Sequence, residues 1–330
     1  MVATNTGGSR FIKYGDVRRN ILALTVVLAD NTGTVLELGS DLRKNNTGVD
    51  WKQLFIGTGG AFGIITECVL NVEYLPRQIA TAYLVPADSA SVMPLLMLFE
   101  RKFGAYLSAF EGMSGNAIAT TLDQIASVRN PFQGGKIPDY VILLEISRSW
   151  EHRESEQSLD AVLEEALMAA WEGDEALLAD AFVGPPNQMW ALRHALSEGL
   201  KHAGKVIAFD VSFRRQAVTA FCDFMKRKMP EKYPSVTICD FGHIGDGGVH
   251  LNLVVDNDSH HLSNPDFEDQ LRQWVYSVVV NEFGGSFSAE HGIGRKNQKY
   301  YDHYTNGKIR DLAANFKSAS GLRQIGAALY

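Results

Sequence analysis

The chain has 330 residues with 45% hydrophobic side chains, which is long enough for two domains with large cores and typical of a globular protein. Its formal net charge of −7 argues against a general surface for nucleic acids or other polyanions. The three cysteines, Cys68, Cys222 and Cys239, are far apart in the sequence, which disfavours a disulfide framework, a thiolate zinc site and an iron–sulfur cluster.

Neither a membrane-spanning apolar run nor an export signal can be recognised in the sequence. We therefore expect a cytoplasmic protein.

The first 75 residues predict a small β-rich domain. Two β-rich runs at 22–29 and 34–38 are separated by a turn-forming segment, which predicts a hairpin. A glycine-rich connection at 57–63 leads into another β-branched run, and Pro76 ends the segment.

Strands and helices alternate from residue 76 to about residue 285. Strands are expected at 79–85, 106–111, 140–146, 206–213, 236–241 and 249–255. Helices are expected near 88–102, 114–128, 151–170, 186–202, 215–229 and 264–283. Because polar and apolar residues alternate in several strands, we expect a largely antiparallel sheet covered by helices on one face. The predicted fold class is α+β.

The segment 241–253 carries the most informative polar residues. His243 and His250 are too far apart, and of the wrong parity, to share one face of a straight strand. The glycines between them permit a tight turn that would bring the two rings together. Two converging neutral imidazoles are ready ligands for a divalent metal ion.

Glu290 is the carboxylate expected to complete this metal site. It lies in a second glycine-flanked loop, at 284–294, directly before His291. A single histidine is more often structural than a ligand. Two glycine-rich loops that both carry metal-binding residue types favour the functional interpretation.

Other polar residues suit the binding of a small acid. Arg193 can hold a carboxylate through two parallel hydrogen bonds, and Ser197 lies one helical turn later. A structural ion pair remains an equal alternative for Arg193. Asn252 shares a strand face with His250.

Five motifs together carry a family resemblance. They lie at 4–8 (Thr-Asn-Thr-Gly-Gly), 41–48, 57–66, 242–252 and 288–292. In this order they resemble the FAD-linked oxidases of the vanillyl-alcohol-oxidase superfamily, and within it the D-2-hydroxyacid dehydrogenases that act on D-lactate, glycolate or D-2-hydroxyglutarate. The resemblance covers about residues 1–300 and implies a flavoenzyme that oxidises a D-2-hydroxy acid to the 2-oxo acid.

The resemblance also implies roles for individual residues. A divalent metal, expected to be zinc, would be held by His243, His250 and Glu290, while His291 would be the general base. Arg193, Ser197 and Asn252 would contact the substrate. The positions implied to contact FAD are Asn5, Thr6, Gly7, Gly8, Gly63, Ile64, Glu290 and His291.

Domain roles and partners follow from the same resemblance. Residues 1–75 would be the remnant of the second FAD-binding subdomain, of PCMH type, 76–285 the cap domain that binds substrate and metal, and 286–330 a segment returning to the flavin. The resemblance implies a homodimer. Since the chain has no cysteine set for a cluster, electrons are expected to pass to an external carrier such as a quinone or an electron-transfer flavoprotein, or to oxygen.

Three departures from the family pattern shape these expectations. The first FAD subdomain, which precedes the Thr-Asn-x-Gly-Gly loop in the family, is absent, so we expect a truncated chain that binds FAD weakly or not at all. The family's closing Asn-Pro-Gly-Lys motif has no match at 321–330. Ala208 replaces a lysine of the hydroxyglutarate enzymes, which disfavours a dicarboxylate substrate.

Two other functions stay open. The chain could be a non-catalytic, flavin-poor subunit of a glycolate-oxidase-like complex. It could also be a zinc hydrolase that uses the same three metal ligands, although no H-E-x-x-H motif is present.

Overall fold

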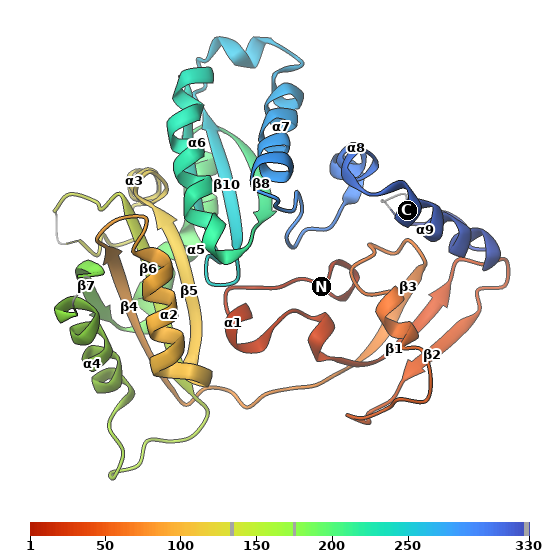
Figure 1. The fold of residues 1–330 in the computed structure, drawn as a ribbon, viewed down its shortest axis with the longest axis horizontal. Coiled ribbons are helices and arrows are strands. Elements are labelled where there is room, and N and C mark those ends of the chain that lie inside the picture. Colours follow the sequence, from red (N-terminus) through yellow and green to blue (C-terminus); the bar gives the residue numbers. More distant parts are fainter. Residues whose placement is uncertain (133–134, 174–175, 327–329) are drawn as a thin grey trace. The chain divides into compact units, whose positions relative to one another are not determined.

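The computed structural model describes residues 1–132, 135–173, 176–326 and 330. The α+β class expected from the sequence is confirmed (Figure 1). The chain forms two compact units: the first contains Met1–Gly8, Gly15–Glu73 and Phe287–Tyr330, and the second contains Ser9–Tyr14 and Tyr74–Ser286. The roles predicted for the three segments of the chain stay predictions.

The first unit is built on an antiparallel sheet. Its strands are β1 (Ile21–Leu28), β2 (Val35–Gly39) and β3 (Gly63–Leu70), in the order β2-β1-β3. The predicted hairpin is confirmed, since β1 and β2 pair directly. Asp30 holds the turn by accepting hydrogen bonds from the backbone N–H groups of Thr32 and Thr34 at 3.0 and 3.1 Å.

Apolar side chains from both ends of the first unit's sequence form its core. Helices α8 (Gly294–Tyr304) and α9 (Gly307–Ala319) belong to this unit. Phe316 of α9 packs edge-on against Phe62, with ring centroids 5.3 Å apart. On β3, by contrast, most side chains are exposed.

The second unit contains a larger sheet in the order β7-β4-β6-β5-β9-β10-β8. All its described pairings are antiparallel, as predicted. The strands are β4 (Gln78–Pro86), β5 (Leu107–Ser114), β6 (Tyr140–Arg148), β7 (Leu178–Gly184), β8 (Lys205–Ser212), β9 (Val236–Gly242) and β10 (Gly248–Val255). Strand β7 was not predicted, because it is a half-exposed edge strand with few β-branched residues.

Helices cover both faces of the larger sheet, so the expectation of a single covered face is wrong. Phe241 of β9 packs in the core shared with α3 (Gly115–Gln124) and α5 (Pro186–Ala203). Its neighbour Asp240 faces the opposite way and contacts Cys222 of α6 (Val218–Lys232). Because successive strand residues point to opposite faces, both faces are buried.

The remaining helices complete these layers. Figure 1 shows α2 (Val92–Phe103) and α6 in front of the sheet. Helix α4 (Leu159–Glu172) contacts α2, and α7 (Phe267–Ser277) packs Tyr276 against Phe209 of β8. The short helix α1 (Phe11–Tyr14) contacts β5. No helix in the described part of the chain has both the length and the apolar character needed to cross a membrane.

Candidate active site

The turn between β9 and β10 brings two histidines together. His243 directly follows β9, and its carbonyl oxygen accepts hydrogen bonds from the backbone N–H groups of Asp246, Gly247 and Gly248 at 3.0, 3.2 and 3.1 Å. Gly247 has a φ of 99°, which a residue with a side chain rarely adopts. The turn leaves the Nε2 atoms of His243 and His250 only 3.3 Å apart.

A carboxylate lies behind each of these two rings. Nδ1 of His243 lies 2.7 Å from Oε1 of Glu111. Nδ1 of His250 lies 3.6 Å from Oδ1 of Asp210, its register partner on β8. Because Nδ1 of His243 lies within hydrogen-bond distance of the Glu111 carboxylate, the proton of this ring lies on Nδ1 and its Nε2 lone pair faces Nε2 of His250. A proton or a cation between the two Nε2 atoms satisfies this lone pair.

The spacing of the two nitrogens fits a divalent metal ion. Two zinc–nitrogen bonds of about 2.0–2.1 Å at a tetrahedral angle place the nitrogens about 3.3 Å apart. His243 and His250 match this separation without any side-chain movement. Carboxylates on the far nitrogens are the usual support of metal-binding histidines, because they fix the tautomer and the ring orientation.

Glu111 links this histidine pair to Arg193. The carboxylate is 1% exposed, and its Oε2 accepts hydrogen bonds from Nε and Nη2 of Arg193 at 2.9 and 2.8 Å. Burial alone would raise the pKa of Glu111. The hydrogen bond from His243 and the charge of Arg193 outweigh burial, so the pKa lies below its usual value.

Arg193 therefore makes the ion pair that the sequence left as an alternative. Its guanidinium also stacks over the ring of Phe241, 4.8 Å from the centroid. The Nε–Nη2 edge is occupied by Glu111, so a substrate carboxylate would have to approach from the Nη1 side. Ser197 is exposed on the same helix.

Asn252 is buried beside His250 on β10. Its Nδ2 donates a hydrogen bond to the backbone oxygen of His250 at 3.1 Å, which orients the amide. The substrate-binding roles of Arg193, Ser197 and Asn252 stay predictions.

The residues predicted to contact FAD in the first unit lie in ordered local structure. Asn5 has a φ of 51°. Its side chain donates to Asp16 and accepts from the backbone N–H of Arg18, both at 2.8 Å, so it folds its own loop. The hydroxyl of Thr6 shares a hydrogen bond with Thr4 at 2.8 Å.

The other predicted flavin contacts differ in exposure. Gly63 is buried at the start of β3, where a Cβ atom would lie 2.8 Å from a methyl group of Val26, while Ile64 is 56% exposed. A Cβ atom on Gly8 would meet open space. Gly7 lies in the same loop. Their flavin-binding roles stay predictions.

Glu290 and His291 belong to the first unit and lie in a bend before α8. Ser288, just before them, donates from its hydroxyl group to the backbone oxygen of Gly292 at 2.9 Å, which closes the bend. The metal, flavin and base roles of Glu290 and His291 stay predictions.

Glu111 was not singled out from the sequence, although a signal existed. It is an acidic residue in the middle of a strand whose neighbours are apolar or small. Buried carboxylates are rare unless they are paired, so an acidic residue in such a strand indicates a partner.

A second acidic residue of this kind, Glu145, lies on the adjacent strand β6 and is also 1% exposed. It accepts hydrogen bonds from Nε and Nη2 of Arg10, both at 2.8 Å, from Nε1 of Trp190 at 2.7 Å and from the hydroxyl of Ser108 at 2.8 Å. These donors, from Arg10, β5 and α5, saturate the carboxylate, and they include neither His243 nor His250.

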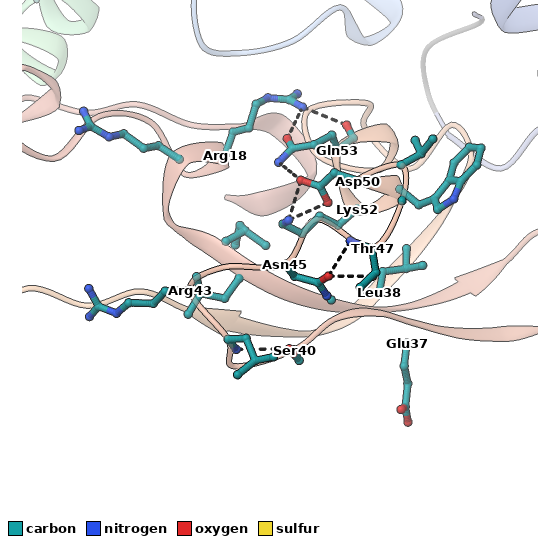
Figure 2. A pocket seen from close by; sticks show the side chains of 18 of the residues that line it. Arg18, Glu37, Leu38, Ser40, Arg43, Asn45, Thr47, Asp50, Lys52 and Gln53 are labelled. Carbon is teal, nitrogen blue, oxygen red and sulfur yellow. Dashed lines mark hydrogen bonds and ion pairs between the residues drawn. The ribbon is translucent and has the colours of Figure 1, made fainter.

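The first unit contains a cavity of about 770 Å³ beside β1 and β2 (Figure 2). Arg18 donates hydrogen bonds to the backbone and side-chain oxygens of Gln53 at 2.9 and 3.1 Å, and Lys52 donates to Asp50 at 2.7 Å. Figure 2 shows Glu37 pointing away from these pairs. None of the described residues that line this cavity is a predicted site residue.

Comparisons with known proteins agree with this architecture. The family model of FAD linked oxidases, C-terminal domain, matches residues 75–319. The D-2-hydroxyglutarate dehydrogenase of Stutzerimonas stutzeri is 33% identical over 92% of this chain and 62% of its own length. The mitochondrial D-2-hydroxyglutarate dehydrogenase of Rattus norvegicus is 34% identical over 89% of this chain and 52% of its own length. The chain thus spans little more than half the length of these relatives.

Solved structures show the same fold at low sequence identity. The structure of p-cresol methylhydroxylase with substrate bound has a TM-score of 0.64 at 13% identity, covering 96% of this chain and 65% of that one. The 4-ethylphenol oxidase of Gulosibacter chungangensis has a TM-score of 0.63 at 15% identity, covering 96% of this chain and 67% of that one. The family match covers well over half of the sequence, so the chain belongs to the FAD-linked oxidases and carries their C-terminal domain.

Proposed function

We propose that this chain supplies the substrate- and metal-binding part of an FAD-dependent dehydrogenase that oxidises a D-2-hydroxy acid to the 2-oxo acid. The observation that carries the proposal is the pair of Nε2 atoms 3.3 Å apart, with a carboxylate behind each ring. Family membership and the names of the relatives support the reaction class.

The proposed metal ligands are His243, His250 and Glu290, and the proposed metal is zinc. The covalent chain supports the third ligand. Ser286 pairs with Ser212 at the end of β8. Glu290 follows four residues later, so its Cα atom lies no more than about 14 Å from that of Ser286. A divalent ion held by these residues would polarise the substrate's 2-hydroxyl group and lower its pKa.

In this proposal the chain's own residues bind the acid and move one proton. The Nη1 side of Arg193 and the side chains of Ser197 and Asn252 orient the substrate. His291 takes the proton of the 2-hydroxyl group. FAD, when bound, would supply the acceptor for the hydride from C2. Carbon C2 becomes the carbonyl of the product. The proposed flavin contacts are Asn5, Thr6, Gly7, Gly8, Gly63, Ile64, Glu290 and His291.

A binding and turnover experiment on the purified full chain tests this function. The chain is loaded with zinc and FAD, and reduction of a redox dye is followed with D-2-hydroxyglutarate, D-lactate and glycolate. The L-enantiomers of the chiral acids and a chelator-treated sample are the controls. We expect stereoselective, zinc-dependent binding of a D-2-hydroxy acid by calorimetry, and dye reduction in samples that retain flavin absorbance. Binding that ignores both stereochemistry and zinc contradicts the proposal.

The same samples separate the remaining alternatives. A preference for D-lactate over D-2-hydroxyglutarate would agree with the expected effect of Ala208. Ester hydrolysis by the zinc-loaded chain without FAD would favour a hydrolase instead. The external electron acceptor, the homodimer and the cytoplasmic location stay predictions.

A further inference from the structure

We propose that Glu111 is a positioning residue, which holds His243 in the tautomer whose Nε2 atom faces His250 and ties that ring to Arg193. This inference rests on the metal site of the proposed function. Neither the family match nor the names of the relatives assign a role to this carboxylate.

The hydrogen-bond chemistry of Glu111 determines the tautomer of His243. An ionised carboxylate can only accept hydrogen bonds, so the ring nitrogen 2.7 Å from Oε1 must be the donor. Nδ1 of His243 therefore carries the proton. A neutral imidazole has one proton on its two nitrogens, so Nε2 keeps its lone pair and can bind a metal.

Burial strengthens the effect of Glu111 on the tautomer of His243. Glu111 is 1% exposed, and His243 and Arg193 are each 8% exposed. Water therefore competes little for the carboxylate oxygens. The two hydrogen bonds from Arg193 to Oε2 compensate the buried negative charge, which lets Glu111 stay ionised beside His243.

The two oxygens of Glu111 thus connect two functional groups from different elements. Arg193 comes from α5, and His243 comes from the turn after β9. A shift of the carboxylate would move the imidazole and the guanidinium together. The proposed metal ligand and the proposed substrate-binding arginine therefore share one support.

Glu145 offers a matched control on the adjacent strand. It has the same residue type and exposure and also pairs with an arginine, but its other partners are Trp190 and Ser108. Replacing it tests the general cost of losing a buried carboxylate. Replacing Glu111 tests that cost together with the support of His243.

Metal affinity is the first readout. Wild type, Glu111→Gln, Glu145→Gln and His243→Ala are titrated with zinc, as full chains, in competition with a chromophoric chelator. We expect Glu111→Gln to weaken zinc binding about 10–100-fold, the usual effect of losing a ligand's hydrogen-bond partner, and Glu145→Gln to leave it unchanged. Wild-type affinity in Glu111→Gln overturns the inference.

The tautomer of His243 is the second readout and needs no metal. Nitrogen NMR of the histidine-labelled, metal-free chain identifies which ring nitrogen is protonated. We expect the proton on Nδ1 in wild type and in Glu145→Gln, and a loss of this preference in Glu111→Gln. A proton on Nε2 of His243 in wild type overturns the inference even if Glu111→Gln does not fold.

The two readouts also distinguish this inference from the proposed function. If wild type binds no zinc, or His243→Ala binds it as tightly, the metal site of the proposed function fails, and the tautomer measurement still decides the role of Glu111. If His243→Ala loses zinc and Glu111→Gln keeps it, only the present inference fails.

Discussion

Glu111 and Glu145 lie on adjacent strands, point to the same face of the sheet and are equally buried, and residues of α5 contact both of them. The difference is the last partner. Glu145 accepts hydrogen bonds from the indole of Trp190 and the hydroxyl group of Ser108, and both groups need only an acceptor. Glu111 is hydrogen-bonded to the imidazole of His243, whose second nitrogen faces His250. Burial of a charge therefore does not by itself identify a functional carboxylate. The functional carboxylate is the one whose hydrogen-bond partner has a second reactive atom, as His243 does.

Removing one of the two imidazoles should have the largest effect. His250→Ala deletes one converging nitrogen, so we expect zinc affinity to fall by more than the roughly 10–100-fold loss assigned to a supporting residue. Competition titration against a chelator measures it. The exposed histidine of α5, changed in His202→Ala, is the control and should bind like wild type. Unchanged zinc binding in His250→Ala would mean that the histidine pair is not a metal site. Glu111 would then support no metal ligand and would not differ from Glu145 in this respect.

The second-largest expected effect is a difference in the free energy of unfolding between variants of Glu111 and Glu145. Glu111→Ala leaves the charge of Arg193 buried without its partner, which costs about 3–5 kcal/mol. Glu145→Ala should cost about 1–3 kcal/mol, because the side chain of Arg10 is 38% exposed and can turn to water. Urea unfolding of the metal-free chains measures both. Equal losses would contradict the different roles of the two arginines.

Trimming the partners of Glu145 should have a smaller effect. Ser108→Ala removes the hydroxyl that donates to the backbone and side-chain oxygens of Glu145 and leaves the contacts with Arg10 and Trp190 in place, so we expect a loss of about 1 kcal/mol. Zinc affinity should not change. A loss of zinc binding in Ser108→Ala would show that the Glu145 network supports the histidine pair after all.

An exposed carboxylate should show the smallest effect. Hydrogen bonds from the hydroxyl and backbone N–H groups of Thr34 lower the pKa of Asp30. A lowered pKa stabilises the folded chain above the unfolded value of about 4, and this contribution disappears as the pH falls through the folded value. Asp30→Ala should therefore be slightly less stable than wild type at neutral pH and equal to it in strong acid. Urea midpoints at both conditions measure the difference.

Much of the fold could be predicted from local patterns. The hairpin at 22–38 and the strand at 249–255 follow from alternation and turn residues, and the structure contains both. The position of the helices on both faces could not be predicted, because Asp240 and Phe241 look like an ordinary polar–apolar pair. Asp240 is nevertheless buried, since it contacts Cys222 of α6.

The site divides in the same way. The approach of His243 and His250 could be inferred, because both lie within one short segment and the glycines between them permit a tight turn. Glu111 could not be assigned to His243, since the two are 132 positions apart and only the pairing of β5 with β9 brings them together.

The amino-acid sequence by itself determined the class of the fold, the order of most strands and helices, and the histidine pair at the turn, because these depend on residues close together in the chain. Only the tertiary structure decided which faces are covered, that Arg193 pairs with Glu111, and which buried carboxylate supports a histidine. These outcomes depend on the pairing and packing of distant segments, where a buried charge selects its partner from the groups that the fold places within hydrogen-bond distance.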